Sequence, residues 1–370
     1  MIKEGHIGYR EGIALTVILI SGKIYTGFPR VMVEEGKTAA WLLVLLSTAL
    51  SVVAFLPIPH LLARFPGKSY YEVVEEVAGP YLGVLALVLS SGFYLFLLGI
   101  LVREFAEIVA STVLPFTPIS VITIALLLVM AYGAYAGLEP LTRTAWILAP
   151  WILAGLLAVL LLSLRWAKFQ YLLPFWGAGI PSLLKSSVFR TSLFVEVLLL
   201  PLLVPHLREP QRLAVMGIWS IVISGIVMSF VVLLFVTVFP VRAAVNVLFP
   251  VFQMARIMFL GRFFQRMESL FIFVWVISAA VQLAGVLQAT ALALARIMKL
   301  PVYRPLIFPL SVLTFAIAFI PPDLPAAIRI DDEFLRYYGA ITAFGLTTTV
   351  YVVALIRGKG RKARGRVKKS

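Results

Sequence analysis

The chain has 370 residues, of which 61% are hydrophobic and 13% are charged, and its mean hydropathy is +1.02. Soluble domains are about half apolar and about a quarter charged, so this composition indicates an integral membrane protein and excludes a soluble globular enzyme. Cysteine is absent and the histidines lie far apart, so no metal or other cofactor is expected. The net charge of +15 does not indicate nucleic acid, because the basic residues gather at segment ends and in the tail.

Apolar segments of about twenty residues predict ten membrane helices in an all-α protein. In chain order they cover 7–30, 38–61, 80–110, 119–138, 143–164, 187–207, 211–240, 265–298, 304–321 and 334–357. The first is predicted to be broken, because residues 21–27 interrupt it with polar and glycine positions. The sixth is predicted to be broken because it contains Pro201 and Pro205.

Three connections are predicted to be structured. Ser69 and Glu72 have the spacing of a capping box and predict a short helix over 69–79. Segment 166–186 carries an aromatic cluster typical of the membrane interface. Segment 243–263 is apolar but too interrupted to span, and we expect a helix that lies on the membrane surface or dips into it.

Ten spans place both termini on one side of the membrane. The tail from Arg357 to Lys369 holds eight basic residues, which predicts that this side is cytoplasmic. Residues 1–165 and 166–357 are predicted to be two five-helix repeats of opposite orientation, followed by a basic cytoplasmic tail at 358–370. Each repeat opens with a broken helix, which is the layout of inverted-repeat transporters.

Lys23 and Glu196 lie inside the two broken spans, where a charge costs at least a few kcal/mol unless it is paired, hydrated or used. Three interpretations stay open. The two residues can bind a ligand, form a structural ion pair without a ligand, or couple the protein to protons. Lys23 could also take the place of a sodium ion.

An amino-acid ligand would bring a carboxylate and an ammonium to this region. Backbone N–H groups freed at a break bind a carboxylate well, and Gly22 and Gly27 permit such a break. Glu196 would meet the ligand ammonium or Lys23. The predicted ligand-binding residues are Ser21, Gly22, Lys23, Tyr25, Thr26, Gly27, Tyr94, Phe194, Glu196, Trp275, Ser278 and Gln282.

Several of these residues also have simpler explanations. A buried tyrosine such as Tyr94 more often satisfies a backbone carbonyl. Polar groups at helical spacing in the eighth span, such as Gln282, commonly form interhelical hydrogen bonds. Arg103 and Glu107 are spaced to pair along a helix, and with Glu104 they are expected to form an interfacial network or to support a gate.

Two motifs carry a resemblance to a known family. The runs Leu101-Val-Arg-Glu-Phe-Ala-Glu-Ile108 and Phe249-Pro-Val-Phe-Gln-Met-Ala-Arg256 resemble spore germination proteins of the GerAB/YndE type. That family resembles amino acid–polyamine–organocation transporters with a five-plus-five inverted repeat. Unlike the usual transporter pattern, residues 192–197 contain no glycine at the expected break.

The resemblance implies a B subunit of a germinant receptor in the spore inner membrane, beside an A subunit and a lipoprotein C subunit. It implies that the protein senses or carries a small germinant such as an amino acid. The alternative function is an ion channel or a structural scaffold subunit without its own ligand site. The chain carries no P-loop, no Ser/His/Asp constellation and no His-Glu-x-x-His helix, so an enzyme is not expected.

Overall fold

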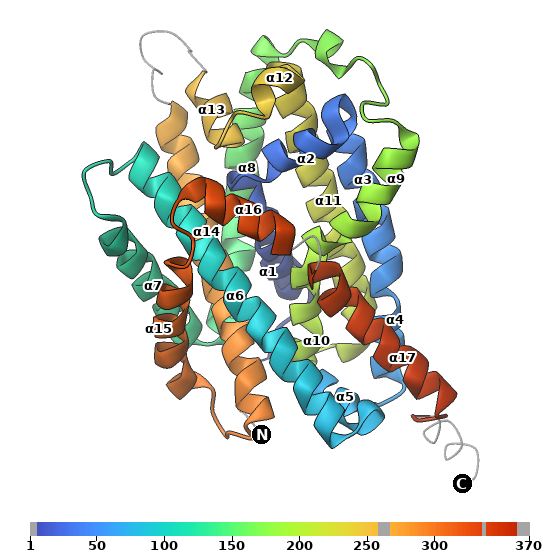
Figure 1. The fold of residues 1–370 in the computed structure, drawn as a ribbon. Helices are drawn as coiled ribbons and strands as arrows, with labels where there is room; N and C mark the ends of the chain where they lie inside the picture. The colour runs from blue at the N-terminus through green and yellow to red at the C-terminus, as the bar shows by residue number, and fades with distance from the viewer. Residues whose placement is uncertain (1–5, 258–266, 335–337, 361–370) are drawn as a thin grey trace.

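The computed structural model describes residues 6–257, 267–334 and 338–360, and its regular elements there are helices (Figure 1). Seven helical segments in this part of the chain are long and apolar enough to cross a membrane. They are Phe28–Ala63, Pro80–Thr112, Ile119–Ala136, Leu138–Trp166, Ile180–His206, Pro210–Val238 and Phe271–Ile297. The protein is therefore an all-helical integral membrane protein.

Three of the ten predicted spans do not form a long continuous helix. The first is split into α1 (Tyr9–Ser21), a 3-10 turn η1 (Gly22–Tyr25) and α2 (Phe28–Gly36). The ninth and tenth correspond to the shorter apolar helices Arg304–Ala318 and Leu346–Ile356. Positions 265–266 and 335–337 of the predicted spans lie outside the described residues. Seven spans are thus supported by length, and ten remains a prediction.

The remaining helices follow the predicted order. Their bounds are α3 (Ala40–Phe55), α4 (Pro57–Ala63), α5 (Tyr70–Ala78), α6 (Pro80–Thr112), α7 (Ile119–Ala136), α8 (Leu138–Ser163), α9 (Ile180–Phe189), η5 (Arg190–Leu198), α10 (Leu199–Leu203), α11 (Leu213–Val238), α12 (Val241–Ala244), α13 (Pro250–Arg256), α14 (Met267–Ile297), α15 (Ile307–Ala318), α16 (Leu324–Phe334) and α17 (Leu346–Ile356). The sixth span thus begins at Ile180 rather than at 187, because α9 continues directly into η5.

The predicted connections agree with the structure in part. Ser69 caps α5, since its backbone N–H donates to the Glu72 carboxylate at 2.6 Å and its hydroxyl accepts from the Glu72 N–H. Phe169 and Trp176 in the segment 166–186 are exposed, as expected of an interfacial cluster. Segment 243–263 does not form one helix: it contains the end of α12 and then α13, and its last six residues lie outside the described chain.

Small residues let the central helices approach closely. A Cβ atom on Gly225 of α11 would lie 2.1 Å from the Thr48 hydroxyl oxygen of α3, and one on Gly217 would lie 2.1 Å from the Phe55 ring. Only glycine permits these contacts, which are typical of helix packing in membranes. The α1 helix packs in the centre against α8, α11 and α14, so both broken segments are surrounded by other helices.

The start of α1 and the end of α17 lie at the same end of the bundle, the lower end in Figure 1. Ile7 forms two backbone hydrogen bonds with the end of the sixth span, to His206 at 2.9 Å and from Arg208 at 3.0 Å. Arg64 after α4 donates to the Lys359 carbonyl at 3.0 Å beyond α17. This placement fits an even number of crossings. The division into repeats at residue 165 and the side on which the termini lie stay predictions.

Candidate ligand site between the two broken helices

The first break follows from a close approach between α1 and α14. A Cβ atom on Gly22 would lie 1.9 Å from the Gln282 side-chain oxygen, so a larger residue where η1 begins would displace the Gln282 amide. The backbone then tightens into the 3-10 turn, and Thr26 leaves the helical region at φ −98° and ψ −153°. Gly27 starts the path into α2. Residues 22–27 therefore lie in a non-α segment in the middle of the protein.

The second break occurs without a glycine. Residues 190–198 form the 3-10 segment η5, and Phe194 takes non-helical torsions of φ −110° and ψ 16°. Side chains from other helices satisfy carbonyl groups along this segment. Lys23 Nζ donates to the Leu193 carbonyl at 2.7 Å, and the Tyr94 hydroxyl donates to the Val195 carbonyl at 3.0 Å. These bonds satisfy carbonyl groups of an irregular backbone, because lipid offers no hydrogen-bond donors to them.

Lys23 and Glu196 join the two breaks. The lysine ammonium lies 2.7 Å from one carboxylate oxygen of Glu196 and 2.8 Å from the other. The side chains are 4% and 0% exposed, so water screens this pair very little. The structure thus brings the two residues together as an ion pair, and the Leu193 carbonyl is a further acceptor for the ammonium.

The predicted residues of the eighth span lie around the first break. The Gln282 amide donates to the Leu19 carbonyl at 3.1 Å, which is an interhelical bond of the ordinary kind. Trp275 stacks on Phe105 with ring centres 5.4 Å apart, and its indole nitrogen has no hydrogen-bond partner. Ser278 is buried in the same helix. These contacts describe a packed core beside the break.

Tyr25, Ser21 and Phe194 are also enclosed by protein. The Tyr25 ring packs against Phe271 of α14 with centres 5.8 Å apart. The Ser21 hydroxyl is buried and has no hydrogen-bond partner, so it is available to a ligand or a water molecule. Phe194 is fully buried.

A cavity of about 30 Å³ lies next to the ion pair. Lys23, Thr26 and Gly27 are the predicted residues that line it. The other lining residues are Phe28, Val31, Met32, Glu104, Arg190, Leu193, Ile328, Asp331 and Asp332. A water molecule needs at least about 10–15 Å³ measured in this way, so the cavity has room for one or two waters. The described state is closed around the ion pair.

Sequence reasoning missed a second charged group at this cavity. Arg190 Nε donates to one carboxylate oxygen of Glu35 of α2 at 3.0 Å, and its guanidinium lies 3.0 Å from the other oxygen as an ion pair. Arg190 also pairs with Asp332 of α16. The guanidinium is 3% exposed, so it joins three segments inside the protein. The signal was weak because these residues lie at segment ends, where charges usually face water.

Glu104 differs from the expectation of an interfacial network. Glu104 is 1% exposed, and its side chain lines the cavity. Its neighbour Glu107 instead pairs with Arg103 at 2.8 Å. Positions 103 and 107 lie on nearly the same face of α6, whereas position 104 is turned about 100° from position 103 in a helix with 3.6 residues per turn. This rotation directs Glu104 to the cavity while Arg103 and Glu107 pair.

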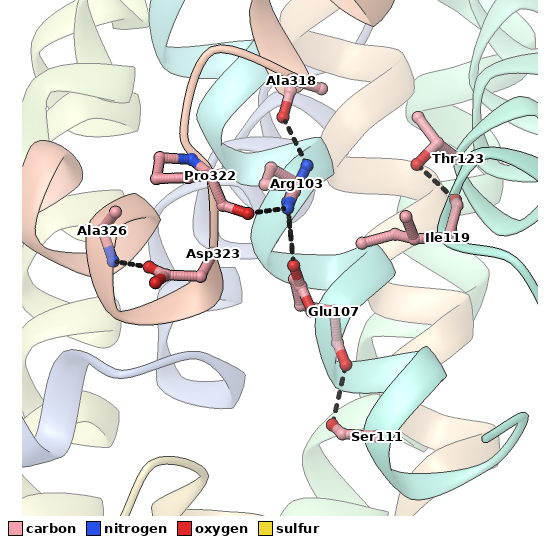
Figure 2. Close-up of polar contacts among 9 residues, drawn as sticks. All are labelled: Arg103, Glu107, Ser111, Ile119, Thr123, Ala318, Pro322, Asp323 and Ala326. Carbon is pink, nitrogen blue, oxygen red and sulfur yellow. Dashed lines mark hydrogen bonds and ion pairs between the residues drawn. The ribbon is translucent and has the colours of Figure 1, made fainter.

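Arg103 holds the loop that leads into α16, as Figure 2 shows. Its guanidinium donates to the Ala318 carbonyl at 3.4 Å and to the Pro322 carbonyl at 3.0 Å. Asp323 then accepts from the Ala326 N–H at 2.8 Å at the start of α16. These bonds position α16 so that Asp331 and Asp332 reach the cavity.

Comparison with solved structures gives the fold. A structure of MhsT in complex with L-phenylalanine has a TM-score of 0.64 at 16% identity, covering 97% of this chain and 90% of that one. A Na+-coupled sialic acid symporter has a TM-score of 0.64 at 14% identity, covering 96% of this chain and 80% of its own. Mhp1, a nucleobase-cation-symport-1 family transporter, has a TM-score of 0.58 at 12% identity, with 95% and 75% covered. The chain therefore has the transporter-like LeuT fold.

Comparison of sequences gives the family. YndE of Bacillus subtilis (strain 168) is 25% identical over 77% of this chain and 80% of its own length. Spore germination protein B2 of the same organism is 22% identical over 92% of this chain and 91% of its own length. The family described as "Spore germination protein" (Spore_permease) matches residues 6–326. The chain belongs to the spore germination protein family, whose members are transporter-like membrane proteins and not enzymes.

Proposed function

We propose that this protein is a B-type subunit of a spore germinant receptor and that it binds a small amino acid where the two broken helices meet. The observation that carries the proposal is the buried Lys23–Glu196 pair, which lies between two irregular backbone segments. The family and the transporter fold support it, and one transporter of this fold was solved with L-phenylalanine.

The chemistry of the pair matches a zwitterion. Lys23 would contact the ligand carboxylate, and Glu196 would contact the ligand ammonium. Each side chain would thus replace its present partner by a ligand group that carries the same charge as that partner. The freed N–H groups of η1 would add hydrogen bonds to the carboxylate. The exchange leaves no buried charge unpaired, which is the condition for holding ions in a membrane protein.

Binding requires an opening, because the cavity beside the pair is about 30 Å³. The ion group of Arg190, Glu35 and Asp332 links α2, η5 and α16 at this cavity, so its rearrangement is a direct route to a wider site. A ligand that binds the open form more tightly would shift the population toward it. Alternating access between the two sides of the membrane would turn the same change into transport.

Thermal-shift titration of the purified protein with each of the twenty amino acids tests the proposal. We expect at least one of them to stabilise the protein. Lys23→Ala and Glu196→Gln should each weaken that binding by about tenfold or more, which is about 1.4 kcal/mol. Glu34→Gln is the matched control, since Glu34 forms an ion pair with Arg30 on the exposed side of α2. Undiminished stabilisation in both site variants would remove these residues from the ligand site.

Reconstitution in liposomes separates the remaining possibilities. A transporter would accumulate a labelled amino acid, whereas a sensor subunit would bind it without flux. The second candidate function, an ion channel or structural scaffold, is favoured by the closed ion pair and the small cavity. It predicts no stabilisation by any amino acid, and for a channel it predicts ion conductance.

The cellular setting completes the proposal. We place the protein in the spore inner membrane with both termini cytoplasmic, beside A and C receptor subunits and surrounded by the lipid bilayer. Fusion of a reporter after residue 370 would test the orientation.

A further inference from the structure

The cavity beside the ion pair carries more acidic than basic side chains. Lys23 forms an ion pair with Glu196, and Arg190 forms ion pairs with Glu35 and Asp332. Within the described parts of the chain, Glu104 of α6 and Asp331 of α16 also line or border this space and form no ion pair there. Two carboxyl groups therefore remain beside the cavity after every nearby cation has been matched.

These two carboxyl groups lack full hydrogen bonding. Glu104 is 1% exposed and its Oε2 atom has no hydrogen-bond partner. Asp331 is half-buried, but its Oδ1 atom is buried and also has no hydrogen-bond partner. The two groups interact electrostatically with each other. Two ionised carboxylates in one dry site repel each other and lose their hydration, so such a pair tends to keep one proton.

Thr26 connects Glu104 to the first broken segment. The Thr26 hydroxyl donates to the Lys23 carbonyl at 3.0 Å and also interacts with the Glu104 side chain.

We propose that Glu104 and Asp331 form a proton-binding site that holds one proton at neutral pH and exchanges it when the cavity opens. The proton is bound as O–H on one of the four carboxylate oxygens, and it leaves to water when α16 and α6 separate. The site is a second one beside the Lys23–Glu196 pair, and it does not depend on the identity of the organic ligand.

The charged surroundings favour this state. Lys23 comes from η1, Arg190 and Glu196 come from η5, and Asp332 neighbours the pair on α16. Neither α14 nor α15, which also pack on α6, lines the cavity with a described residue. Burial is the main cause that raises the pKa of Asp331 to about 7, with Asp332 and Glu196 adding to it and Lys23 and Arg190 opposing it.

A proton fits the cavity better than a metal cation does. Ca²⁺ takes six to eight oxygen ligands and Mg²⁺ near-octahedral coordination, whereas this site offers two carboxyl groups and one hydroxyl. The Lys23 ammonium lines the same space and would repel a second cation. In the described residues no group of three or more His, Asp or Glu side chains is arranged to hold a metal ion.

The test uses the full-length protein in detergent without any amino acid. Thermal unfolding is measured from pH 4 to pH 8 for the wild type, Glu104→Gln and Asp331→Asn. Each amide mimics a protonated carboxyl, so we expect both variants to unfold at a higher temperature than the wild type at pH 8. The difference should vanish toward pH 4, where the wild-type pair is protonated as well. Glu107→Gln is the matched control on α6, because Glu107 already has Arg103 as its partner.

Infrared spectroscopy detects the protonation of a carboxyl group directly, and a purely structural role of these residues would not produce that signal. The wild type at pH 7 should show the C=O band of a protonated carboxyl group, and both amide variants should lack it. The proposal is overturned if this band is absent from the wild type or persists in both variants. It is also overturned if Na+ in place of choline stabilises the wild type but not Glu104→Gln, because the site would then bind a cation.

Discussion

Replacing both members of the Lys23–Glu196 pair by methionine should cost less stability than replacing either one. Lys23→Met leaves a carboxylate in a site where Glu196 is 0% exposed, and Glu196→Met leaves an ammonium in the same site. Removing one partner of a buried pair costs about 3–5 kcal/mol, because the other charge stays buried and unmatched. The two single variants therefore sum to about 6–10 kcal/mol.

The double variant removes both charges at nearly constant volume, which is often neutral or stabilising for a buried pair. It still leaves the Leu193 carbonyl without the Lys23 donor at 2.7 Å, a loss of about 1–3 kcal/mol. We therefore expect the double variant to cost at most about 3 kcal/mol, and to fall short of the sum of the single variants by at least about 3 kcal/mol.

Equilibrium unfolding in detergent measures the four free energies of this cycle, and intrinsic tryptophan fluorescence reports the transition. The same cycle at Arg30 and Glu34 is the control, since that pair is 24% and 40% exposed and such pairs contribute about 0–1 kcal/mol. Additive losses at Lys23 and Glu196 would show that the two charges do not depend on each other. The double variant also separates roles, because a purely structural pair predicts that amino-acid binding survives in it.

Two further substitutions test the supports of the site. Gly22→Ala should destabilise the protein by about 1–3 kcal/mol, because its Cβ would lie 1.9 Å from the Gln282 side chain, and Gln282→Ala should relieve much of this cost. The control Gly92→Ala, where no atom lies within 4 Å of the added Cβ, should be neutral or stabilise α6. Arg103→Met should remove the bonds to the loop before α16 and make that loop more accessible to proteolysis, an outcome that a protected loop in the variant would contradict.

Hydropathy and helix-end signals were enough to predict the helical class, the order of the segments and the capped helix α5. These signals could not place the ends of α15 and α17. Both helices are shorter than a membrane span, and periodicity does not show where a long apolar segment bends. Because residues 192–197 contain no glycine, the sequence did not decide whether the second helix is broken there. The break is held by side chains from other helices, and such long-range contacts leave no local signal in the sequence.

The two central residues were found because a charge within an apolar run is conspicuous. Arg190, Asp331 and Asp332 were missed because each lies next to a segment end, where a charge is ordinary. Asp331 and Asp332 line the cavity because α16 lies against it, and Arg103 binds the loop that leads into α16. Glu104 was noticed but was grouped with its neighbours, since sequence spacing alone does not say which side of α6 faces the interior.

The sixth span is held to its neighbours at two places by different kinds of bond. Near its end, Ile7 is joined to it by backbone hydrogen bonds, which involve no side chain. Earlier in the span, Arg190 is bound through charge to the carboxylates of Glu35 and Asp332. A side-chain substitution can therefore release the second attachment and leave the first intact, so evolution can adjust the two ends of this span separately.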